Sequence, residues 1–227
     1  MTLLTSTLLE AAGFRHAFPT RETAEATDEA LLSALGTAAV VQVRQVHGAR
    51  VVDAAEARGA EADAIVAPGG GTVAVGVRVA DCVPVLVADE ASGGVAAIHA
   101  GWRGVVAGVV GAGVRRLVCA GDGETAVAAP AAGRRVIAAI GPCIGPCCFE
   151  VGREVATQIG FVVREAGDSA FVDLRAAVRA QLRALGLDDA RIEDVPGCTK
   201  HEPARFHSFR RDGASSGRML AAIATRA

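Results

Sequence analysis

The chain has 227 residues, 51% of them hydrophobic and 21% charged, a balance typical of a globular protein rather than a disordered one. Its net charge of -2 and its 4% of aromatic residues argue against a nucleic-acid-binding surface, which needs excess basic charge and rings for base stacking. The first residues lack the basic region of a signal peptide, and the most apolar stretch, 72–87, is interrupted by Arg78, Asp81 and Pro84. We therefore expect a cytoplasmic protein that binds neither nucleic acid nor membrane.

Apolar periodicity and turn residues predict strands and helices that intermix without a regular rhythm. In chain order, the expected elements are a strand at 14–18, a helix at 22–35, strands at 40–46, 51–53, 72–79, 83–87 and 95–98, a helix at 105–118, a surface loop at 119–134, a strand at 136–140, helices at 154–159 and 173–185, and strands at 191–195 and 219–224.

Two of these patterns are especially informative. The runs 83–87 and 95–98 are continuously apolar, as expected of strands that are covered on both faces. In the helix at 173–185, Asp173 is the expected N-cap and Gly186 the expected end. The whole pattern predicts a mixed α/β sandwich that forms one domain over 1–227.

Three short motifs place a histidine or a cysteine where an apolar run gives way to a polar or turn-forming segment. They are Arg44-Gln-Val-His-Gly48, Val79-Ala-Asp-Cys-Val-Pro84 and Val95-Ala-Ala-Ile-His-Ala-Gly-Trp-Arg-Gly104. Two imidazoles and one thiolate suit Zn²⁺ and leave a fourth position for water. The three ligands are far apart in the sequence, so a buried thiol or a hydrogen-bonded core histidine is an equally good interpretation of each residue alone.

The segment 141–150 contains Cys143, Cys147 and Cys148 between and after two Gly-Pro steps. Such a concentration of thiols is a candidate for a separate metal site. The segment lacks paired Cys-x-x-Cys knuckles, however, and its Gly-Pro steps indicate a rigid turn. We favour structural packing here.

The remaining cysteines and histidines have weaker contexts. Cys198 lies three residues before His201, and one such pair without a second favours a structural role, as we also expect for Cys119. His16 and His207 have no metal-binding context, and the residues around His207 indicate an ordinary strand edge. In a reduced compartment these thiols are not expected to form disulfides.

Five arginines lie in or near turn-like segments, where a guanidinium fork suits phosphate and carboxylate groups. For four of them a solvated surface charge is the better interpretation. Arg103 is the exception, because it follows His99 by four residues. The five are Arg21, Arg44, Arg103, Arg210 and Arg211. No phosphate-binding P-loop and no dinucleotide-binding glycine motif is present.

Five motifs together carry a resemblance over residues 13–223. They are Gln45-Val-His-Gly48, Ala80-Asp-Cys-Val-Pro84, His99-Ala-Gly-Trp-Arg-Gly104, Ile140-Gly-Pro-Cys-Ile-Gly-Pro-Cys-Cys-Phe-Glu-Val-Gly152 and Phe209-Arg-Arg-Asp-Gly213. In this combination the chain is similar to the multicopper polyphenol oxidase (laccase-domain) family, also called the purine nucleoside phosphorylase family of that type.

The resemblance implies a four-layer α/β/β/α sandwich and one Zn²⁺ ion held by His47, Cys82 and His99. It implies purine nucleosides and phosphate as substrates, with phosphorolysis of adenosine, inosine, guanosine and methylthioadenosine and deamination of adenosine. The older oxidase name refers to copper-dependent phenol oxidation, so copper is the alternative metal. We expect a monomer or a small homo-oligomer.

The chain departs from the family pattern in two places. The region 21–40 is short and lacks the Gly-Gly-Val-Ser and Asn-Leu-Gly segments of relatives. Val178 stands where relatives commonly have asparagine, on the apolar stripe of the helix at 173–185. Both departures concern the substrate range more than metal binding.

The resemblance and the residues lead to a hypothesis for each reaction. In deamination, zinc would activate water for attack on C6 of adenine, with Asp81 transferring a proton or orienting a ligand, or acting only as a turn cap. In phosphorolysis, Arg103 would hold phosphate with help from Arg44 or Arg21, and phosphate would attack C1′ of the ribose. The further candidate substrate-binding residues are Arg21, Gln45 and Arg211.

Three rival functions remain at this point. Copper at the same residues would give a phenol oxidase, although a multicopper centre needs many imidazoles and the chain has 5 histidines. Cys82 with His99 as its base would give a cysteine hydrolase. A metal-binding protein without catalytic activity is the third.

Overall fold

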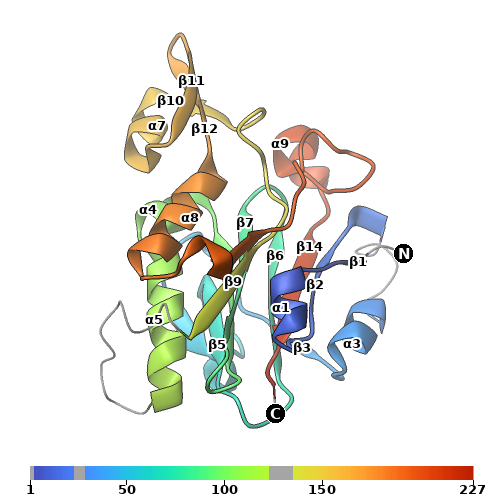
Figure 1. The fold of residues 1–227 in the computed structure, drawn as a ribbon. Helices are drawn as coiled ribbons and strands as arrows, with labels where there is room; N and C mark the ends of the chain where they lie inside the picture. Colours follow the sequence, from blue (N-terminus) through green and yellow to red (C-terminus); the bar gives the residue numbers. More distant parts are fainter. Residues whose placement is uncertain (1–2, 23–28, 123–134, 227) are drawn as a thin grey trace.

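The computed structural model describes residues 3–22, 29–122 and 135–226, and two facing β-sheets form its centre (Figure 1). The first sheet has the strand order β1 (Leu3–Leu4), β2 (His16–Pro19), β14 (Met219–Ala224), β6 (Ala74–Val79) and β3 (Val40–Val41). The second has the order β13 (Ile192–Asp194), β9 (Val136–Ile140), β7 (Val83–Asp89), β8 (Val95–Ala100), β5 (Ala64–Ala67) and β4 (Val51–Asp53). Each sheet contains parallel and antiparallel pairs, so the expected mixed α/β class is confirmed.

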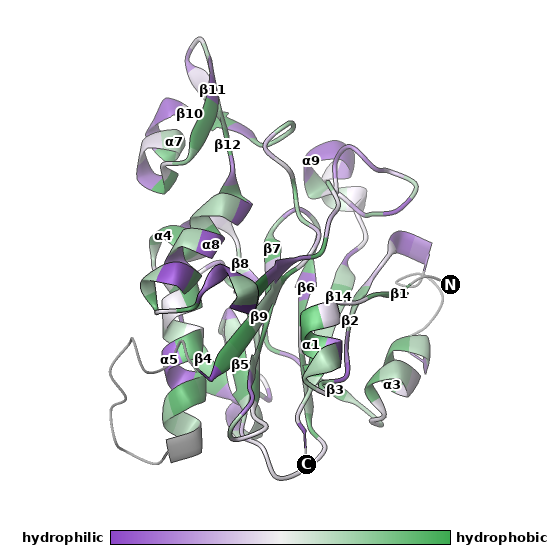
Figure 2. Ribbon diagram, in the orientation of Figure 1, coloured by the Kyte–Doolittle hydropathy of each residue, from purple (hydrophilic) through white to green (hydrophobic). Residues whose placement is uncertain are grey.

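Apolar side chains fill the space between the two sheets and the space under the helices. Along β7, Val85 and Val87 pack on the helix side, while Leu86 packs between the sheets beside Phe14 and Phe18. All of β7 and β8 is buried, which explains their continuously apolar sequences. Figure 2 shows hydrophobic residues along β5 and β9, whereas α9 carries hydrophilic ones.

Helices cover the outer faces of both sheets. The six-stranded sheet is covered by α4 (Trp102–Val106), α5 (Val109–Asp122) and α8 (Leu174–Ala184), and the five-stranded sheet by α3 (Glu29–Leu35). The short α1 (Thr7–Ala11) packs against β9 and β13. The shorter remaining elements are α9 (Phe209–Asp212) and the 3-10 turns η1 (Ala54–Glu56), η2 (Asp189–Arg191) and η3 (Gly213–Ser215).

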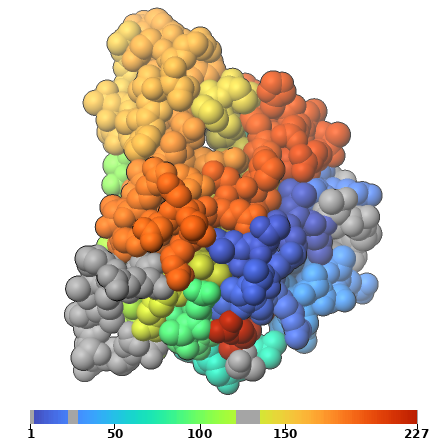
Figure 3. All heavy atoms as spheres, viewed as in Figure 1, coloured from blue at the N-terminus to red at the C-terminus, as the bar shows by residue number. Residues whose placement is uncertain are grey.

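A third sheet lies outside this layered arrangement and was not part of the expected sandwich. It has the order β10 (Glu150–Gly152), β12 (Ser169–Val172) and β11 (Val162–Ala166), and α7 (Arg153–Ile159) packs against it. Figure 3 shows this unit as the upper lobe of the molecule, next to the loop that follows β9. The strand β11 is largely exposed, so no strong apolar alternation marked it in the sequence.

Most of the predicted elements are present, with corrections that have local causes. The helix predicted at 105–118 is two helices, because Gly108 adopts a φ of +82° that interrupts the helical backbone. The strand predicted at 40–46 stops at Val41. The loop predicted at 119–134 begins later, since α5 continues to Asp122, and 123–134 lies outside the described residues, as does 23–28 of the first predicted helix. The strand edge expected around His207 leads instead into α9.

The helix α8 forms as predicted. The side chain of Asp173 accepts a hydrogen bond from the amide of Ala176 at 2.9 Å, and Gly186 follows the last turn with a φ of +87°. Val178 is fully buried in the core under the helices, so this departure from the family pattern is accommodated by apolar packing.

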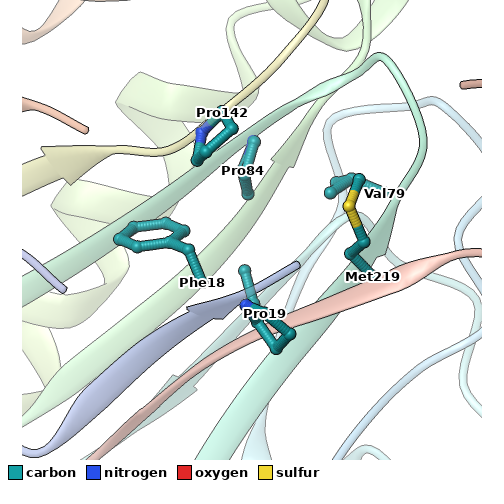
Figure 4. Close-up of a pocket in the computed structure, with 7 residues that line it drawn as sticks. Phe18, Pro19, Val79, Pro84, Pro142 and Met219 are labelled. Atoms are coloured by element: carbon teal, nitrogen blue, oxygen red, sulfur yellow. The ribbon is translucent and has the colours of Figure 1, made fainter. Parts of the chain in front are cut away.

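A small apolar void of about 10 Å³ lies between the two sheets (Figure 4). Its walls are Phe18, Pro19, Val79, Pro84, Pro142, Met219 and Ala221. A space of this size is at the lower limit for a single water molecule, and its apolar walls offer such a water no partners. It is therefore a packing defect and not a binding site. Separately, none of the described helices has the length and hydropathy to cross a bilayer.

The buried His16 makes the stability of the protein sensitive to mild acid. Its Nε2 accepts a hydrogen bond from the amide of Ser6 at 2.7 Å, and its Nδ1 donates to the carbonyl of Phe14 at 2.9 Å, so the folded state needs the neutral ring. Burial lowers the pKa of His16 below its ordinary value of 6.5, against smaller opposing effects of the Phe14 carbonyl, Glu10 and Glu193. The unfolded chain therefore binds the extra proton first, and the free energy of unfolding falls as the pH drops below 6.5.

We expect the variant His16→Gln, which keeps an acceptor and a donor but does not titrate, to lose less stability than the wild type between about pH 7.5 and about pH 5.5. Urea denaturation at the two pH values measures this difference. Equal losses in both proteins would show that the neutral ring of His16 does not matter.

Candidate metal centre

Three side chains from distant parts of the sequence meet at one end of the two sheets. His47 lies in the turn between β3 and β4, Cys82 in the turn between β6 and β7, and His99 near the end of β8. Their ligand atoms all lie within 4.8 Å of one another. The two imidazole rings meet edge to face, with centroids 4.8 Å apart and an interplanar angle of 80°. The structure thus brings together the three residues predicted as metal ligands.

The buried carboxylate of Asp63, directly before β5, holds this arrangement in place. Its Oδ1 accepts from Nδ1 of His99 at 2.8 Å and from the amide of His47 at 2.9 Å, and its Oδ2 accepts from the amide of Gly48 at 2.7 Å. Its Oδ2 also accepts a longer bond from the amide of Val46. Because Nδ1 of His99 donates to Asp63, Nε2 is the nitrogen left to serve as a ligand.

The turn at His47 adopts a backbone conformation that side chains rarely take. Its φ is +62°, and three successive amides of this turn point at one carboxylate. Such a concave row of N–H groups is a favourable site for an anion. The charge of Asp63 therefore stabilises a turn that would otherwise be strained, and this turn sets the position of the His47 side chain.

Gly101 leaves room for the three ligands. A Cβ atom at this position would lie 2.9 Å from Cδ2 of His47 and 3.2 Å from Sγ of Cys82. A side chain there would occupy the space between the ligands, so the geometry requires glycine. An imidazole–thiol–imidazole set with this open space, and with the second nitrogen of His99 already bonded, fits Zn²⁺ well.

The electrostatics of the three groups favour the charged forms of the thiol and of His99. Burial opposes the charge on Cys82, but hydrogen bonds and charge from His47 and His99 lower its pKa to about 7. Burial likewise opposes the charge on His99, but Asp63 and Cys82 raise its pKa to about 9. A thiol that ionises near neutrality is a ready metal ligand.

A cavity of about 530 Å³ opens above the three ligands. Its lining combines aromatic with cationic side chains, namely Trp102, Phe149, Phe209, Arg78, Arg103, Arg210 and Arg218. Its volume lies in the range of small-molecule sites. Aromatic faces suit a planar base, and guanidinium groups suit an anion such as phosphate.

Arg103 has the freest guanidinium in this cavity. It is exposed and stacks on Trp102 with its Cζ 4.4 Å from the ring centroid. In the described part of the chain it makes no hydrogen bond and no ion pair. By contrast, Arg78 donates to Gln42, Arg210 to the carbonyl of Glu150, and Arg218 to the carbonyls of residues 216 and 217.

Three arginines that were predicted to contact phosphate or substrate lie away from this lining, namely Arg44, Arg21 and Arg211. Arg44 is exposed and forms an ion pair with Glu61. Arg21 lines a neighbouring pocket of about 560 Å³ that also contains His207 and Arg218. Gln45 does line the main cavity, but its amide donates to the carbonyl of Arg78 at 2.8 Å and accepts from the amide of Arg78 at 2.7 Å. Gln45 thereby joins the His47 turn to β6.

Arg211 is engaged within the C-terminal segment. Its guanidinium donates to the carbonyls of Thr199, Lys200 and Phe206 and to the carboxylate of Asp212. Arg211 therefore stabilises the loop before α9 and does not line the cavity. Its neighbour Arg210 does line the cavity.

Asp81 also lines the cavity, with both carboxylate oxygens in use. Oδ1 accepts from the hydroxyl of Thr199 and Oδ2 from the amide of Arg210, each at 2.6 Å. Its φ is +92°, and its backbone carbonyl accepts from the amide of Ile144. This is the geometry of a positioning carboxylate, because it ties the turn that carries Cys82 to the loop before α9.

The sequence motifs did not reveal Asp63, Gly101 or Arg78 as parts of the site. Asp63 and the strand after it were not predicted at all, although a carboxylate directly before the apolar run at 64–67 is the signal that marks them. Gly101 was inside a quoted motif, yet only the packing of the three ligands around it shows what it does.

Comparisons with known proteins show the family to which the chain belongs. The family model described as "Multi-copper polyphenol oxidoreductase laccase" matches residues 16–226. An adenosine deaminase from an unknown prokaryotic organism is 38% identical over 81% of this chain and 74% of its own length. Purine nucleoside phosphorylases from Deinococcus radiodurans and Streptomyces coelicolor are 36% and 41% identical, over 85% and 80% of this chain and 74% and 73% of their own.

Two solved structures have a similar fold. A protein of Neisseria meningitidis has a TM-score of 0.72 at 34% identity, covering 88% of this chain and 79% of that one. YlmD from Geobacillus stearothermophilus has a TM-score of 0.79 at 26% identity, covering 98% of this chain and 94% of that one.

The pKa of Cys82 gives a direct test of the geometry. In metal-free protein, we expect alkylation of Cys82 by iodoacetamide to reach half of its maximal rate near pH 7, and to be lost at lower pH as the thiolate is protonated. In Asp63→Asn the half-maximal pH should shift upward toward the ordinary thiol value of 9.0, because His99 loses the carboxylate that keeps it charged.

Asp89→Asn is the matched control, since Asp89 is equally buried but pairs with Arg135 outside the cavity lining. Peptide mass spectrometry reports the alkylated fraction. An identical pH profile in both variants would contradict the role assigned to Asp63.

Proposed function

We propose, because the chain belongs to the multi-copper polyphenol oxidoreductase laccase family, that it is a zinc-dependent purine nucleoside phosphorylase that also deaminates adenosine. The observation that carries this proposal is the group of His47, Cys82 and His99 at the floor of a cavity lined by aromatic rings and free positive charge. The names of the relatives supply the substrate class.

The residues divide into metal-holding and substrate-holding groups. His47, Cys82 and His99 would hold the ion, and Asp63 orients two of them. When bound, Zn²⁺ supplies Lewis-acid activation at the floor of the cavity. Trp102 and Phe149 line the cavity beside the guanidinium groups of Arg103 and Arg210, and a purine base would pack against these rings.

Arg103 would bind phosphate. In phosphorolysis a phosphate oxygen attacks C1′ of the ribose, the C1′–N9 bond breaks, and the base leaves with its bonding electrons. Arg103 neutralises the attacking anion and holds it near C1′, where proximity rather than covalent catalysis lowers the barrier. Asp81 acts through the positions of Cys82 and Arg210 and not as the group that exchanges protons with the substrate.

The available imidazoles favour zinc over a multicopper centre. Within the described ranges, His47 and His99 are the two histidines of the ligand group. His16 is bonded to Ser6 and Phe14, His201 is exposed, and His207 lines the neighbouring pocket. Two imidazoles and one thiolate fit a single ion, as expected for zinc.

The primary experiment follows inosine with phosphate and adenosine alone, using protein loaded with Zn²⁺. We expect hypoxanthine and ribose 1-phosphate in the first case and inosine in the second. Chelation should abolish both reactions and Zn²⁺ should restore them, while Cys82→Ala should lower kcat/KM by about 100-fold or more, because even the supporting residues of a metal site typically matter at that level. Absence of any product from zinc-loaded wild type would overturn the proposal.

The phosphate-binding role of Arg103 is tested separately. We expect Arg103→Ala to raise KM for phosphate by about 10-fold to 100-fold, since a charge-assisted hydrogen bond is lost, and to leave deamination of adenosine much less affected. Arg44→Ala is the matched control, because Arg44 pairs with Glu61 outside the cavity lining. Equal effects of the two substitutions on phosphate would contradict the assignment.

A further inference from the structure

Three other cysteines form a second cluster behind the wall of the cavity. Cys147 and Cys148 lie in the loop after β9, and Cys198 lies in the segment before α9, which runs beside that loop (Figure 1). Sγ of Cys147 is 3.6 Å from Sγ of Cys148 and 3.6 Å from Sγ of Cys198, and all three sulfurs lie within 4.8 Å of one another.

The burial of these thiols does not match the structural packing that the sequence favoured. Cys147 is exposed and the other two are only partly buried, whereas Cys143 of the same loop is fully buried in the core. Packing against the core therefore explains Cys143 and contributes at Cys148, but it does not explain Cys147 or Cys198. An ion can reach the three sulfurs from solvent.

The spacing of the sulfurs matches the edges of a metal–thiolate tetrahedron. With Zn–S bonds of about 2.3 Å, two thiolates of a tetrahedral site lie about 3.8 Å apart. The two 3.6 Å separations approach this value before any ion is bound. Small changes of side-chain rotamer are enough to close the site.

The backbone already supports a thiolate at Cys198. The amide of Gly145 donates to its Sγ at 3.2 Å, and the amide of Cys198 itself is held by Glu202 at 2.7 Å. Ionised thiols at these spacings repel one another, and a cation between the three sulfurs removes that repulsion.

A disulfide explains the closeness of these three sulfurs less well than a bound cation does. Cys147 and Cys148 are adjacent in the chain, and any disulfide among the three leaves one thiol without a partner. Three converging sulfurs match the preference of soft, closed-shell cations for thiolate ligands.

We propose that Cys147, Cys148 and Cys198 form a second metal site for a thiophilic closed-shell cation, Zn²⁺ or Cu⁺, with its remaining coordination position open to solvent. The ion would join the loop after β9 to the segment before α9. Phe149, next to Cys148, lines the cavity, and Thr199, next to Cys198, donates to Asp81. The bound ion would therefore stabilise the part of the cavity wall that includes Arg210.

The experiment uses the full chain with Cys82→Ala, which removes the thiolate of the first site, under reducing and oxygen-free conditions. Co²⁺ is the spectroscopic probe, because thiolate-to-cobalt charge-transfer absorption scales with the number of thiolate ligands. We expect one equivalent of Co²⁺ with the absorption of several thiolates. Titrations with Zn²⁺ and with buffered Cu⁺, each displacing Co²⁺, then identify the preferred ion.

In the same background, Cys147→Ala should weaken Co²⁺ binding by about 100-fold or more, as expected when a ligand is lost. This side chain is exposed, so its removal leaves the fold intact, and Cys198→Ser provides a second variant. Cys119→Ala is the control and should bind Co²⁺ unchanged, since Cys119 lies on α5 outside the cluster.

Three results would overturn the proposal. They are no Co²⁺ binding by folded Cys82→Ala protein, equal binding by the Cys147 and Cys119 variants, and a disulfide between cluster cysteines in protein isolated under reducing conditions. None of these results depends on nucleoside turnover. Failure of the proposed function is seen instead in the zinc-loaded wild type, so the two failures are distinguishable.

Discussion

The carboxylate of Asp63 is the interaction on which the site depends. It has no exposure to solvent, and a buried charge is costly unless it is fully hydrogen-bonded. Four donors from two segments satisfy it: the His99 imidazole and three successive amides of the His47 turn. The folded protein cannot separate these two segments without leaving the charge unpaired, so two ligands of the candidate metal centre are fixed relative to each other before any ion binds.

The sequence predicted the ligands better than it predicted what holds them. His47, Cys82 and His99 each follow or interrupt an apolar run, so their positions near sheet ends could be read locally. Asp63 could not, because its role requires that β5 pair with β8 and bring the carboxylate beside His99, a contact across 36 residues. The same limit applies to Gly101, whose missing side chain matters only once three distant residues surround it.

Arginine roles were the least predictable part of the site. A sequence shows that a guanidinium is available but not which carbonyls or carboxylates it meets after folding. Arg211 and Arg44 find partners within the protein, while Arg103 stacks on its neighbour Trp102. At the level of fold, long apolar strands and the capped helix α8 were predictable because their signals are local. The exposed β11 and the break at Gly108 depend on tertiary context or on one backbone angle.

Two turns at the site have strained backbones that hydrogen bonds hold in place. Among the described residues three non-glycine positions have positive φ, and two of them, His47 and Asp81, border the cavity. Such conformations cost about 1–3 kcal/mol each and persist only when the surroundings impose them. Here each strained turn is secured by a carboxylate, Asp63 for the first and the Asp81 side chain itself for the second. Because the turns carry or adjoin the ligands His47 and Cys82, the stability of the hydrogen-bond network is what maintains the ligand geometry, and binding of an ion need not supply the free energy to form it.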